Sequence, residues 1–283
     1  MSGSLLLYGP SFSCLYFRLL FGLCQERICV GTGTWLYARL QMQTFRFMAK
    51  LIKEISVFFP SYNLEAHVEN TVKKAFNLVP RMADRYEIIE VNDGSSDGTG
   101  RLLNKLKLKY PKLKIITHDV NKGYGSALRS GFYSAKYSWV ALIDGDGQFE
   151  ISELSDFIKK QKETGADLVI GYYRKRQVSK TKIITSKMWE TAVFLLFGLK
   201  VRDIDCGFKL ISKKVFKVIP KLESKRGAFI SSELLIKARK AGFKIVEIPV
   251  THYPRREGKG TGRDFKVIIN SFKDLLKLWR KLL

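Results

Sequence analysis

The sequence contains few histidines and cysteines, and their scarcity argues against several kinds of site. Three histidines occur in 283 residues, too few to favour a zinc centre built on histidine ligands. The four cysteines, at positions 14, 24, 29 and 206, show neither the paired spacing of metal ligands nor the pattern of a disulfide-rich domain. We therefore expect a protein of a reducing compartment without a histidine-rich zinc site.

Acidic residues are scarce relative to basic ones. The chain has 50 lysines and arginines but 26 aspartates and glutamates, so its formal net charge is +24. This excess implies an anionic partner: nucleic acid, phosphorylated small molecules or the surface of a membrane rich in acidic lipids. Long apolar runs are lacking too. The longest uncharged run, residues 1–17, is interrupted by Gly9, Pro10 and several serines, and it makes a poor membrane span.

The first 47 residues differ in composition from the rest. Glu26 is their only acid, and they lack the basic beginning of a secretory signal, although an acid-poor segment with arginines resembles a transit peptide. Met48 begins a stretch that runs directly into the first predicted strand. We expect residues 1–47 to be a poorly structured, dispensable extension of a domain over residues 48–264, which residues 265–283 follow as a helix.

From residue 54 onward, segments with strand character and helix character alternate. Strands are predicted at 55–59, 86–91, 113–117, 139–143, 168–171 and 244–250. Helices are predicted at 64–78, 99–109, 123–135, 151–162, 188–199 and 229–241. This alternation predicts an α/β fold with a mostly parallel sheet flanked by helices. No internal repeat or low-complexity linker divides residues 48–283.

Polar clusters follow four of the predicted strands, at 60–65, 92–97, 121–122 and 144–148. Ligands of open α/β sheets bind outside the carboxyl ends of the strands, so we expect these clusters to meet at one edge of the sheet. The strand before the last cluster is an unbroken apolar run, which is typical of a central strand covered on both faces. It ends in two acids, Asp144 and Asp146.

Two acids at the end of a buried strand are costly unless a positive charge meets them. Glycines at 145 and 147 allow a sharp turn and the close approach of a ligand. The carboxylates of Asp144 and Asp146, with the carbonyl of Gln148, suit Mg²⁺ or Mn²⁺ held jointly with a phosphate-bearing substrate. Taken alone, the same segment also fits an acidic turn after a strand.

The segment 91–100, VNDGSSDGTG, follows the second predicted strand. Asp93 is placed to accept hydrogen bonds from a base or a ribose, and Ser96 or Asp97 is placed to cap the next helix. On its own this is also an ordinary capped turn between a strand and a helix.

Four further motifs make the pattern specific: FPSYNLE (59–65), NKGYGSALRSG (121–131), DGDGQ (144–148) and DIDCGFKL (203–210). With residues 91–100, they resemble the inverting family 2 glycosyltransferases of the GT-A, Rossmann-like fold, and most of all the dolichyl- and polyprenyl-phosphate sugar synthases. The resemblance covers about residues 52–272 in the right order. It implies a hexosyltransferase with a nucleotide-sugar donor of the GDP-mannose or UDP-glucose type. It also implies a divalent metal and a lipid-phosphate acceptor at the cytosolic face of a membrane.

The resemblance also assigns residues. By analogy, the nucleotide sugar is bound by Pro60, Tyr62, Asn63, Glu65, Asn92, Asp93, Lys122, Gly123, Asp144 and Gly145. The metal and the diphosphate fall to Asp144, Asp146 and Gln148. This chain departs from the family twice. Asn92 stands where members usually have aspartate, from which we expect an altered donor preference. Gly171-Tyr172-Tyr173-Arg174 stands where they have Gly-Ser-Arg, so the role of Arg174 is less defined.

Charge predicts the rest of the mechanism. A lipid phosphate is already ionised near pH 7 and needs little or no general base, but it needs cations to approach an anionic donor. The candidate acceptor-phosphate residues are Arg174, Arg255, Arg256, Lys259 and Arg263. The last four lie in a glycine-rich loop that is either a lid over the donor or a solvated basic loop.

Four residues in or after the acceptor-side motif have open roles. Asp203 is a catalytic candidate, and for it and Asp205 we favour positioning of the sugar or of a basic partner over proton abstraction. Cys206 is expected to be a small packed residue, since no histidine adjoins it to activate the thiol. Glu233 either bonds to a loop or lies on a helix surface.

The last predicted helix, 265–283, is amphipathic. Its apolar face carries Ile268, Phe272, Leu275, Trp279 and Leu282, and basic residues occupy the other face. Such a helix is typical of a membrane interface, and the alternative is a helix docked on the domain. A membrane protein that takes up the product is a further candidate partner.

Three alternative functions compete with this interpretation. A family 2 enzyme with a hydroxyl acceptor would need Asp203 or Asp205 as a base. A nucleic-acid binder would interleave aromatic and basic residues on an exposed surface, whereas here the aromatics lie mostly within apolar runs, so we expect no nucleic acid as a partner. A non-catalytic nucleotide-sugar or anion-binding protein would not need both Asp144 and Asp146.

Overall fold

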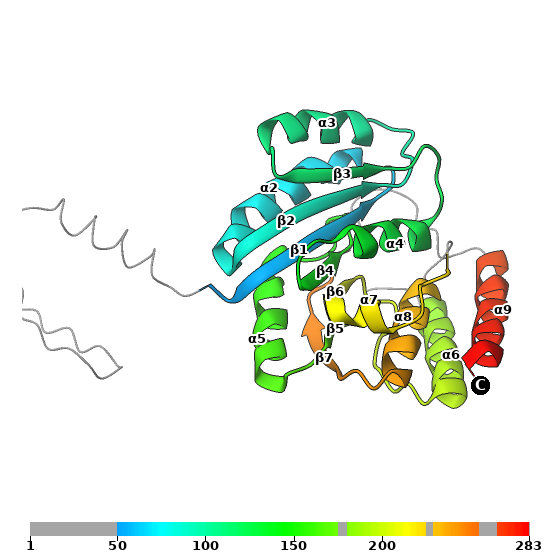
Figure 1. Ribbon diagram of the computed structural model, residues 1–283. Coiled ribbons are helices and arrows are strands. Elements are labelled where there is room, and N and C mark those ends of the chain that lie inside the picture. Colours follow the sequence, from blue (N-terminus) through cyan, green and yellow to red (C-terminus); the bar gives the residue numbers. More distant parts are fainter. Residues whose placement is uncertain (1–49, 175–179, 225–228, 255–264, 283) are drawn as a thin grey trace, which may run out of the picture. The chain divides into compact units, whose positions relative to one another are not determined.

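The computed structural model, shown in Figure 1, describes residues 50–174, 180–224, 229–254 and 265–282, and the side chains of all of these except 180–182 and 265–269. The predicted extension, residues 1–47, lies outside the described residues. So do Arg255, Arg256, Lys259 and Arg263 of the predicted basic loop. These assignments stay predictions.

The strands form one sheet in the order β3-β2-β1-β4-β6-β5-β7. Their bounds are β1 (Ile52–Ser61), β2 (Ala83–Asn92), β3 (Leu113–Thr117), β4 (Trp139–Ile143), β5 (Leu168–Tyr173), β6 (Phe208–Ser212) and β7 (Ile245–Val250). Neighbouring strands are parallel except where β6 pairs antiparallel with β4 and with β5. The predicted α/β architecture with a mostly parallel sheet is confirmed.

Helices cover both faces of this sheet. They are α2 (Glu65–Met82), α3 (Thr99–Lys109), α4 (Tyr124–Ser134), α5 (Leu154–Thr164), α6 (Lys180–Phe197), α7 (Lys213–Val218), α8 (Phe229–Lys240) and α9 (Phe265–Leu282), with a 3₁₀ turn at Ile151–Glu153. The predicted bounds of α3, β3 and β4 agree with the structure. The largest differences from the prediction are that α6 begins at Lys180 rather than at 188 and that the six-residue α7 was not predicted, because so short a segment shows no helical period.

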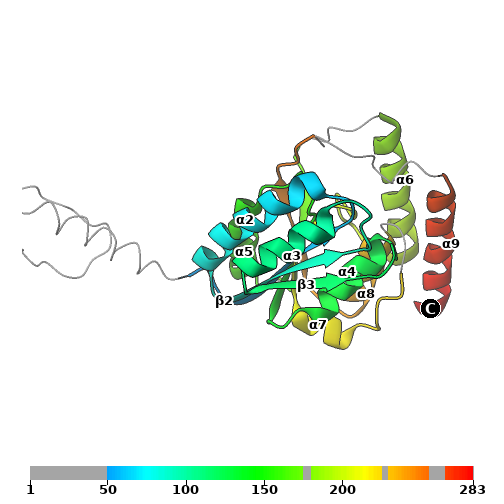
Figure 2. The same ribbon diagram turned by 90° about the horizontal axis from the view of Figure 1, so that it is seen from above.

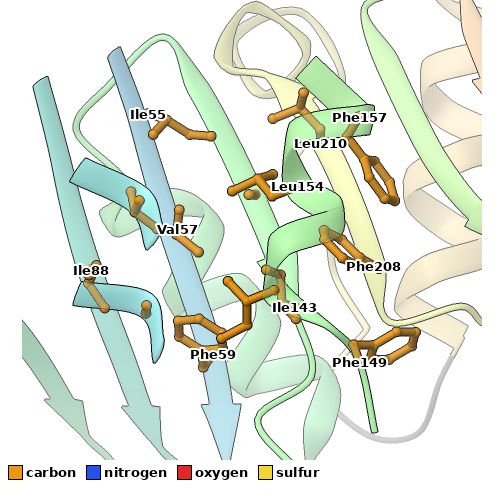
Figure 3. Close-up of a cluster of buried hydrophobic side chains, with 14 of the residues drawn as sticks. Ile55, Val57, Phe59, Ile88, Ile143, Phe149, Leu154, Phe157, Phe208 and Leu210 are labelled. Carbon is orange, nitrogen blue, oxygen red and sulfur yellow. The ribbon is translucent and has the colours of Figure 1, made fainter. Parts of the chain in front are cut away.

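Successive side chains of the central strand β1 enter two different cores, because side chains alternate across a strand. Val57 and Phe59 belong to the core under α2, α3 and α5. Figure 3 shows this cluster, in which Phe157 of α5 stacks on Phe208 with ring centroids 4.1 Å apart. Phe58 belongs to the core on the opposite face, under α4, α7 and α8, and Figure 2 shows the helices of the two faces on opposite sides of the sheet. The unbroken apolar run of β4 is explained in the same way.

The antiparallel β6 brings distant parts of the chain to one edge. Its first residue, Phe208, pairs with Ile143, the last residue of β4. The N–H of Asp144 donates to the carbonyl of Gly207 at 3.1 Å. The motif that precedes β6 therefore lies at the carboxyl end of β4, beside the loops that follow the parallel strands.

Helices α6 and α9 lie side by side in both ribbon views. The apolar face of α9 is largely packed: Leu275 and Leu278 are buried, and the ring of Phe272 lies 5.1 Å from that of Trp189 in α6. Of the two arrangements weighed for this helix, the structure shows the docked one. Within the described residues, no helix is both long enough and apolar enough to span a bilayer.

Helix α6 instead exposes apolar side chains. Ile184, Met188 and Leu195 are 59%, 61% and 75% exposed. At 100° per residue they fall within about 40° of one another on the helix surface, and we call them the α6 stripe. The opposite face of α6 packs into the core through Val193, and the indole N–H of Trp189 donates to Ser232 Oγ of α8 at 2.9 Å.

Candidate active site

The turn after β4 holds its two acids in a fixed backbone. Gly147 has φ +76°, which favours glycine, and a Cβ on Gly145 would lie 3.1 Å from the carbonyl oxygen of Pro60, so this turn packs against the end of β1. Thr71 Oγ1 donates to the carbonyl of Gly145 at 3.3 Å, and the N–H of Gln148 donates to Asp146 Oδ1 at 3.2 Å. Asp144 and Asp146 are both half-buried. A cavity of about 30 Å³ behind the turn has room for a water molecule.

Asp144 is contacted on both carboxylate oxygens. The hydroxyl of Tyr124 donates to Oδ1 at 2.8 Å. On the other side, a Cβ placed on Gly207 would lie 1.9 Å from Oδ2, so the carboxylate occupies the space that a side chain at 207 would need. We did not identify Tyr124 or Gly207 from the sequence, since nothing in the local pattern indicates that α4 and the residue before β6 meet at Asp144.

Gln148, the third predicted metal residue, is joined to Tyr253. The N–H of Tyr253 donates to the main-chain carbonyl of Gln148 at 2.9 Å, and Gln148 Nε2 donates to the carbonyl of Tyr253 at 2.8 Å. Because Nε2 of Gln148 donates to Tyr253, the predicted metal ligand of this residue is its side-chain oxygen. The next residue, Phe149, forms an isolated antiparallel bridge with His252.

These residues fit a hard divalent cation. Their donor atoms are all oxygen, which Mg²⁺ and Mn²⁺ prefer. In the described ranges, no three or more His, Cys, Asp or Glu side chains gather into a group that could hold a metal ion by themselves. This agrees with the way Mg²⁺ is usually bound, by one or two carboxylates together with substrate phosphates.

The acceptor-side motif lies in the same neighbourhood. Burial raises the pKa of Tyr173 well above its usual range, and the charges of Asp203, Asp144 and Asp205 raise it further. Burial, then Asp144, raises the pKa of Tyr124 in the same direction. The structure therefore brings the ends of β4 and β5 and the segment before β6 together.

The two acids of that motif differ in environment. Asp203 is buried, and its Oδ1 accepts the N–H groups of Asp205 and Cys206, each at 3.1 Å. Asp205 is exposed. These bonds show that Asp203 holds the backbone of its own loop, and its predicted positioning of the sugar or of a basic partner stays a prediction. Cys206 is fully buried, as predicted, and burial raises the pKa of its thiol, so the thiolate that a nucleophile needs is disfavoured.

The first two loops of the predicted nucleoside pocket hold each other. Asn63, which adopts φ +52°, accepts the N–H of Ser96 at 2.8 Å through its side chain. Glu65 accepts the N–H of Gly98 at 2.8 Å, and a Cβ at 98 would lie 2.0 Å from the Glu65 carboxylate. Tyr62 is 43% exposed beside them. The structure thus gives Asn63 and Glu65 a loop-holding role and leaves the ring of Tyr62 open to solvent.

Asp97 joins the same pair of loops, and its Oδ1 accepts the N–H of Thr99 at 3.0 Å. The residue at the cap position of α3 is Gly98, so neither Ser96 nor Asp97 occupies the predicted cap. Burial acts to raise the pKa of Asp97, but hydrogen bonds from Thr99 and from the N–H of Glu65 outweigh it, so this pKa is lowered. Asn92 is buried and accepts the N–H of Ser95 at 3.0 Å. The predicted change of donor preference at Asn92 stays a prediction.

Asp93 is buried and holds the third loop. Its carboxylate accepts the N–H groups of Lys122, at 3.0 Å, and of Gly123, at 2.8 Å. His118 Nδ1 lies 2.5 Å from Asp93 Oδ1, and His118 Nε2 lies 2.9 Å from Ser130 Oγ. Gly123 has φ +91°, so this loop needs glycine there. His118 was another residue that we did not single out from the sequence.

Two remaining candidates lie on the second half of the chain. Arg174 is exposed after β5, and its N–H donates to the carbonyl of Val250 at 3.2 Å, which places it at the same edge of the sheet. Glu233 is buried, pairs with Lys237 at 2.6 Å and accepts the N–H of Ser224 at 2.9 Å. Of its two alternatives, the loop-holding one is observed.

Comparison with known proteins identifies relatives of this chain. The model of the family described as Glycosyl transferase family 2 matches residues 56–219. Dolichyl-phosphate beta-glucosyltransferase of Saccharomyces cerevisiae is 32% identical over 223 residues, 70% of this chain and 66% of the relative. Polyprenol monophosphomannose synthase of Mycolicibacterium smegmatis is 30% identical over 212 residues, 71% of this chain and 78% of the relative. Glycosyltransferase AglD of Haloferax volcanii is 26% identical, and the chain spans 37% of its length.

A solved structure shares the fold. Glucosyl-3-phosphoglycerate synthase from Mycobacterium tuberculosis, in complex with Mn²⁺, UDP and phosphoglyceric acid, has a TM-score of 0.60 and 19% sequence identity. The similarity covers 80% of this chain and 78% of that one. The predicted GT-A fold is confirmed.

Proposed function

Because the chain belongs to glycosyl transferase family 2, we propose that this glycosyltransferase moves a hexose from a nucleotide sugar to a dolichyl or other polyprenyl phosphate. One observation carries the proposal. Asp144 and Asp146 share an edge of the sheet with Asp205 and Arg174, which lie on separate segments of the chain. A metal held by the acids and the positive charge of Arg174 at the same edge would offset the repulsion between a donor diphosphate and a second anion.

On the donor side, Asp144, Asp146 and the side-chain oxygen of Gln148 would hold Mg²⁺ or Mn²⁺. When bound, the metal supplies positive charge that stabilises the departing nucleoside diphosphate. Tyr62, exposed beside the first loop, would stack on the base, and the loop at Lys122 and Gly123 would line the pocket, as in the family.

On the acceptor side, a phosphate oxygen would attack the anomeric carbon as the bond from that carbon to the diphosphate oxygen breaks. An ionised phosphate has no proton to lose, so the step needs no general base. A hydroxyl acceptor would instead require a base, for which Asp203, whose Oδ1 already accepts two backbone N–H groups, or the exposed Asp205 would be needed. Arg174, with Arg255, Arg256, Lys259 and Arg263, would bind the acceptor phosphate.

The lipid substrate requires contact with a membrane, and we place this contact on helix α6. The α6 stripe offers three exposed apolar side chains on one face of one helix, whereas much of the apolar face of α9 is packed. The net charge of +24 favours an anionic surface. Peripheral attachment to the cytosolic face, with a membrane protein as a further partner, completes the proposal.

A lipid-extraction assay tests the function. Purified protein, dolichyl phosphate in detergent and Mn²⁺ are incubated with radiolabelled UDP-glucose or GDP-mannose, and the label in the organic phase is counted. We expect one of the two donors to label the lipid and Asp146→Asn to abolish the transfer. Label that appears only in water-soluble products would overturn the lipid acceptor, and no transfer from either sugar would overturn the proposed donors.

A further inference from the structure

Tyr124 joins two parts of the site that are distant in sequence. It is the first residue of α4 and follows Gly123, whose N–H is held by Asp93. Its hydroxyl reaches across to Asp144 at the end of β4, with a donor–acceptor distance of 2.8 Å. The loop that Asp93 holds is thereby connected to the first of the predicted metal carboxylates.

The orientation of Asp144 is restricted from the opposite side as well. Gly207 has no side chain, and Asp144 Oδ2 lies in the space that one would occupy, since a Cβ at this position would lie 1.9 Å from that oxygen. Gly207 is not one of the described glycines that have a positive φ. Its lack of a side chain therefore matters for space rather than for backbone conformation.

We propose that Tyr124 is a positioning residue for Asp144: its hydroxyl, opposite Gly207, sets the carboxylate in the orientation that binds the divalent metal. This inference rests on the proposed function only in the identity of the metal site. Hydrogen-bond partners of metal-binding side chains fix the direction of the donor atom, and their removal commonly weakens metal binding 10–100-fold.

The ring of Tyr124 provides a way to separate positioning from packing. It packs against the core under α4, α7 and α8, while the hydroxyl bonds to Asp144. Tyr124→Phe retains the ring and removes only the donor. Tyr133, on the same helix, offers a matched control, because its hydroxyl accepts the N–H of Leu222 at 2.9 Å, away from Asp144.

The experiment measures Mn²⁺ binding by the loss of the free-ion signal in electron paramagnetic resonance, with Mn²⁺ alone and with UDP or GDP added. We expect Tyr124→Phe to raise the Kd for Mn²⁺ about 10–100-fold and Tyr133→Phe to leave it unchanged. Unchanged or tighter binding by Tyr124→Phe, or an equal loss in Tyr133→Phe, would overturn the inference. Circular dichroism and thermal melts confirm that each variant folds.

A second variant approaches the same carboxylate from its other oxygen. Gly207→Ala should displace Asp144 and weaken Mn²⁺ binding at least as much; if binding is unchanged, Asp144 is not held as proposed. In activity assays, Tyr124→Phe should need more Mn²⁺ for half-maximal rate yet recover much of its kcat at saturating Mn²⁺. A loss of kcat that Mn²⁺ does not restore would contradict positioning.

The two proposals fail in different ways. If the wild type binds Mn²⁺ and Tyr124→Phe binds it more weakly, but no label enters the organic phase, the inference stands and the lipid acceptor is wrong. If the wild type binds no Mn²⁺ with either nucleotide, the metal site and the role of Tyr124 are both wrong.

Discussion

The two halves of the active-site edge are built differently. On the side of β1 to β4, carboxylate side chains hold the loops by accepting hydrogen bonds from backbone N–H groups, as Asp93 does from Gly123 and Glu65 does from Gly98. On the side of α6 and α9, apolar side chains such as Met188 and Leu195 face solvent. A small polar ligand requires donors at fixed positions, whereas a lipid surface requires only apolar area and charge. The difference agrees with the proposed function, which assigns the donor to the first half and the lipid to the second.

In the first half, the largest loss of activity is expected from a substitution at the metal site. Asp146→Ala should lower kcat/KM by about 1,000-fold or more, because a carboxylate that holds the metal against the diphosphate is lost. Initial rates at several Mn²⁺ concentrations measure this effect. Asp156→Asn on α5, whose side chain is 58% exposed, is the control and should retain wild-type activity. Full activity in Asp146→Ala would show that the first half does not bind the metal through this turn.

A smaller effect, on nucleotide affinity, is expected from a substitution that disturbs the loop at Lys122 and Gly123. Asp93→Asn keeps the shape of the side chain but turns an amide N–H₂ toward a backbone N–H, leaving a buried donor unsatisfied. We expect UDP or GDP to bind about 100-fold more weakly, in line with about 1–3 kcal/mol for each lost partner. Isothermal titration calorimetry measures the Kd. Asp84→Asn, exposed on β2, the strand that precedes Asp93, should bind like the wild type, and equal affinities in all three proteins would disprove the loop-holding argument.

Substitutions in the second half should weaken membrane binding without changing the donor site of the first half. Replacing Met188 and Leu195 together by glutamate should reduce binding to anionic vesicles at least about 10-fold, since each apolar side chain buried in lipid contributes about 1.5–3 kcal/mol. Co-sedimentation with vesicles measures this, and nucleotide affinity should stay unchanged. Leu108→Glu on α3 changes a leucine that is more exposed still (84%) and serves as the control. Vesicle binding that persists in the double variant would remove α6 from the proposed membrane contact.

A stability measurement tests a buried acid of the first half. Glu90 of β2 accepts a hydrogen bond from Ser61 at 2.6 Å, and its other oxygen has no partner among the described residues. Burial raises the pKa of Glu90 from 4.5 to about 8, although the Ser61 bond acts in the opposite direction. The folded chain therefore keeps a proton that the unfolded chain releases between these two pH values. Stability from this group is complete below about pH 4.5 and is lost as the pH rises through about 8.

Urea unfolding at a series of pH values tests this. The free energy of unfolding of the wild type should fall with rising pH over that window, by at most about 1.4 kcal/mol for each pH unit. Glu90→Gln cannot release a proton and should show a flatter profile. Glu163→Gln, whose side chain is 64% exposed, should follow the wild type. Parallel profiles for wild type and Glu90→Gln would mean that Glu90 is ionised in the folded state.

Strong local patterns predicted the first half well. The apolar run of β4 has no polar interruption, and α3 begins directly after a glycine-rich turn, so both were placed with the correct bounds. The pattern could not reveal which partners the site residues have. Asp93, assigned to the nucleotide, bonds to His118 and to a loop some thirty residues away, and such contacts depend on how β2, β3 and α4 pack.

The second half was harder to predict for a different reason. An amphipathic helix has the same sequence pattern whether it packs on lipid or on protein, so α9 was assigned to the membrane although Leu275 is buried against its neighbours. In α6 the apolar residues Met188 and Val193 lie on different faces of the helix. Because apolar residues occupy both faces, the sequence pattern does not show which of them are exposed. The antiparallel direction of β6 also has no local signature, since its pairing with β4 joins residues far apart in sequence.

The place of β6 between β4 and β5 has a consequence for synthesis of the chain on the ribosome. β4 is complete at Ile143, but its partner on that side begins only at Phe208, and β5 must wait for the same strand. Until Ser212 has emerged, the nascent sheet keeps one open strand edge of the kind that invites pairing with other chains. The donor-side loops can thus form early, while Asp203 and Asp205 join them only when the last central strand closes the gap.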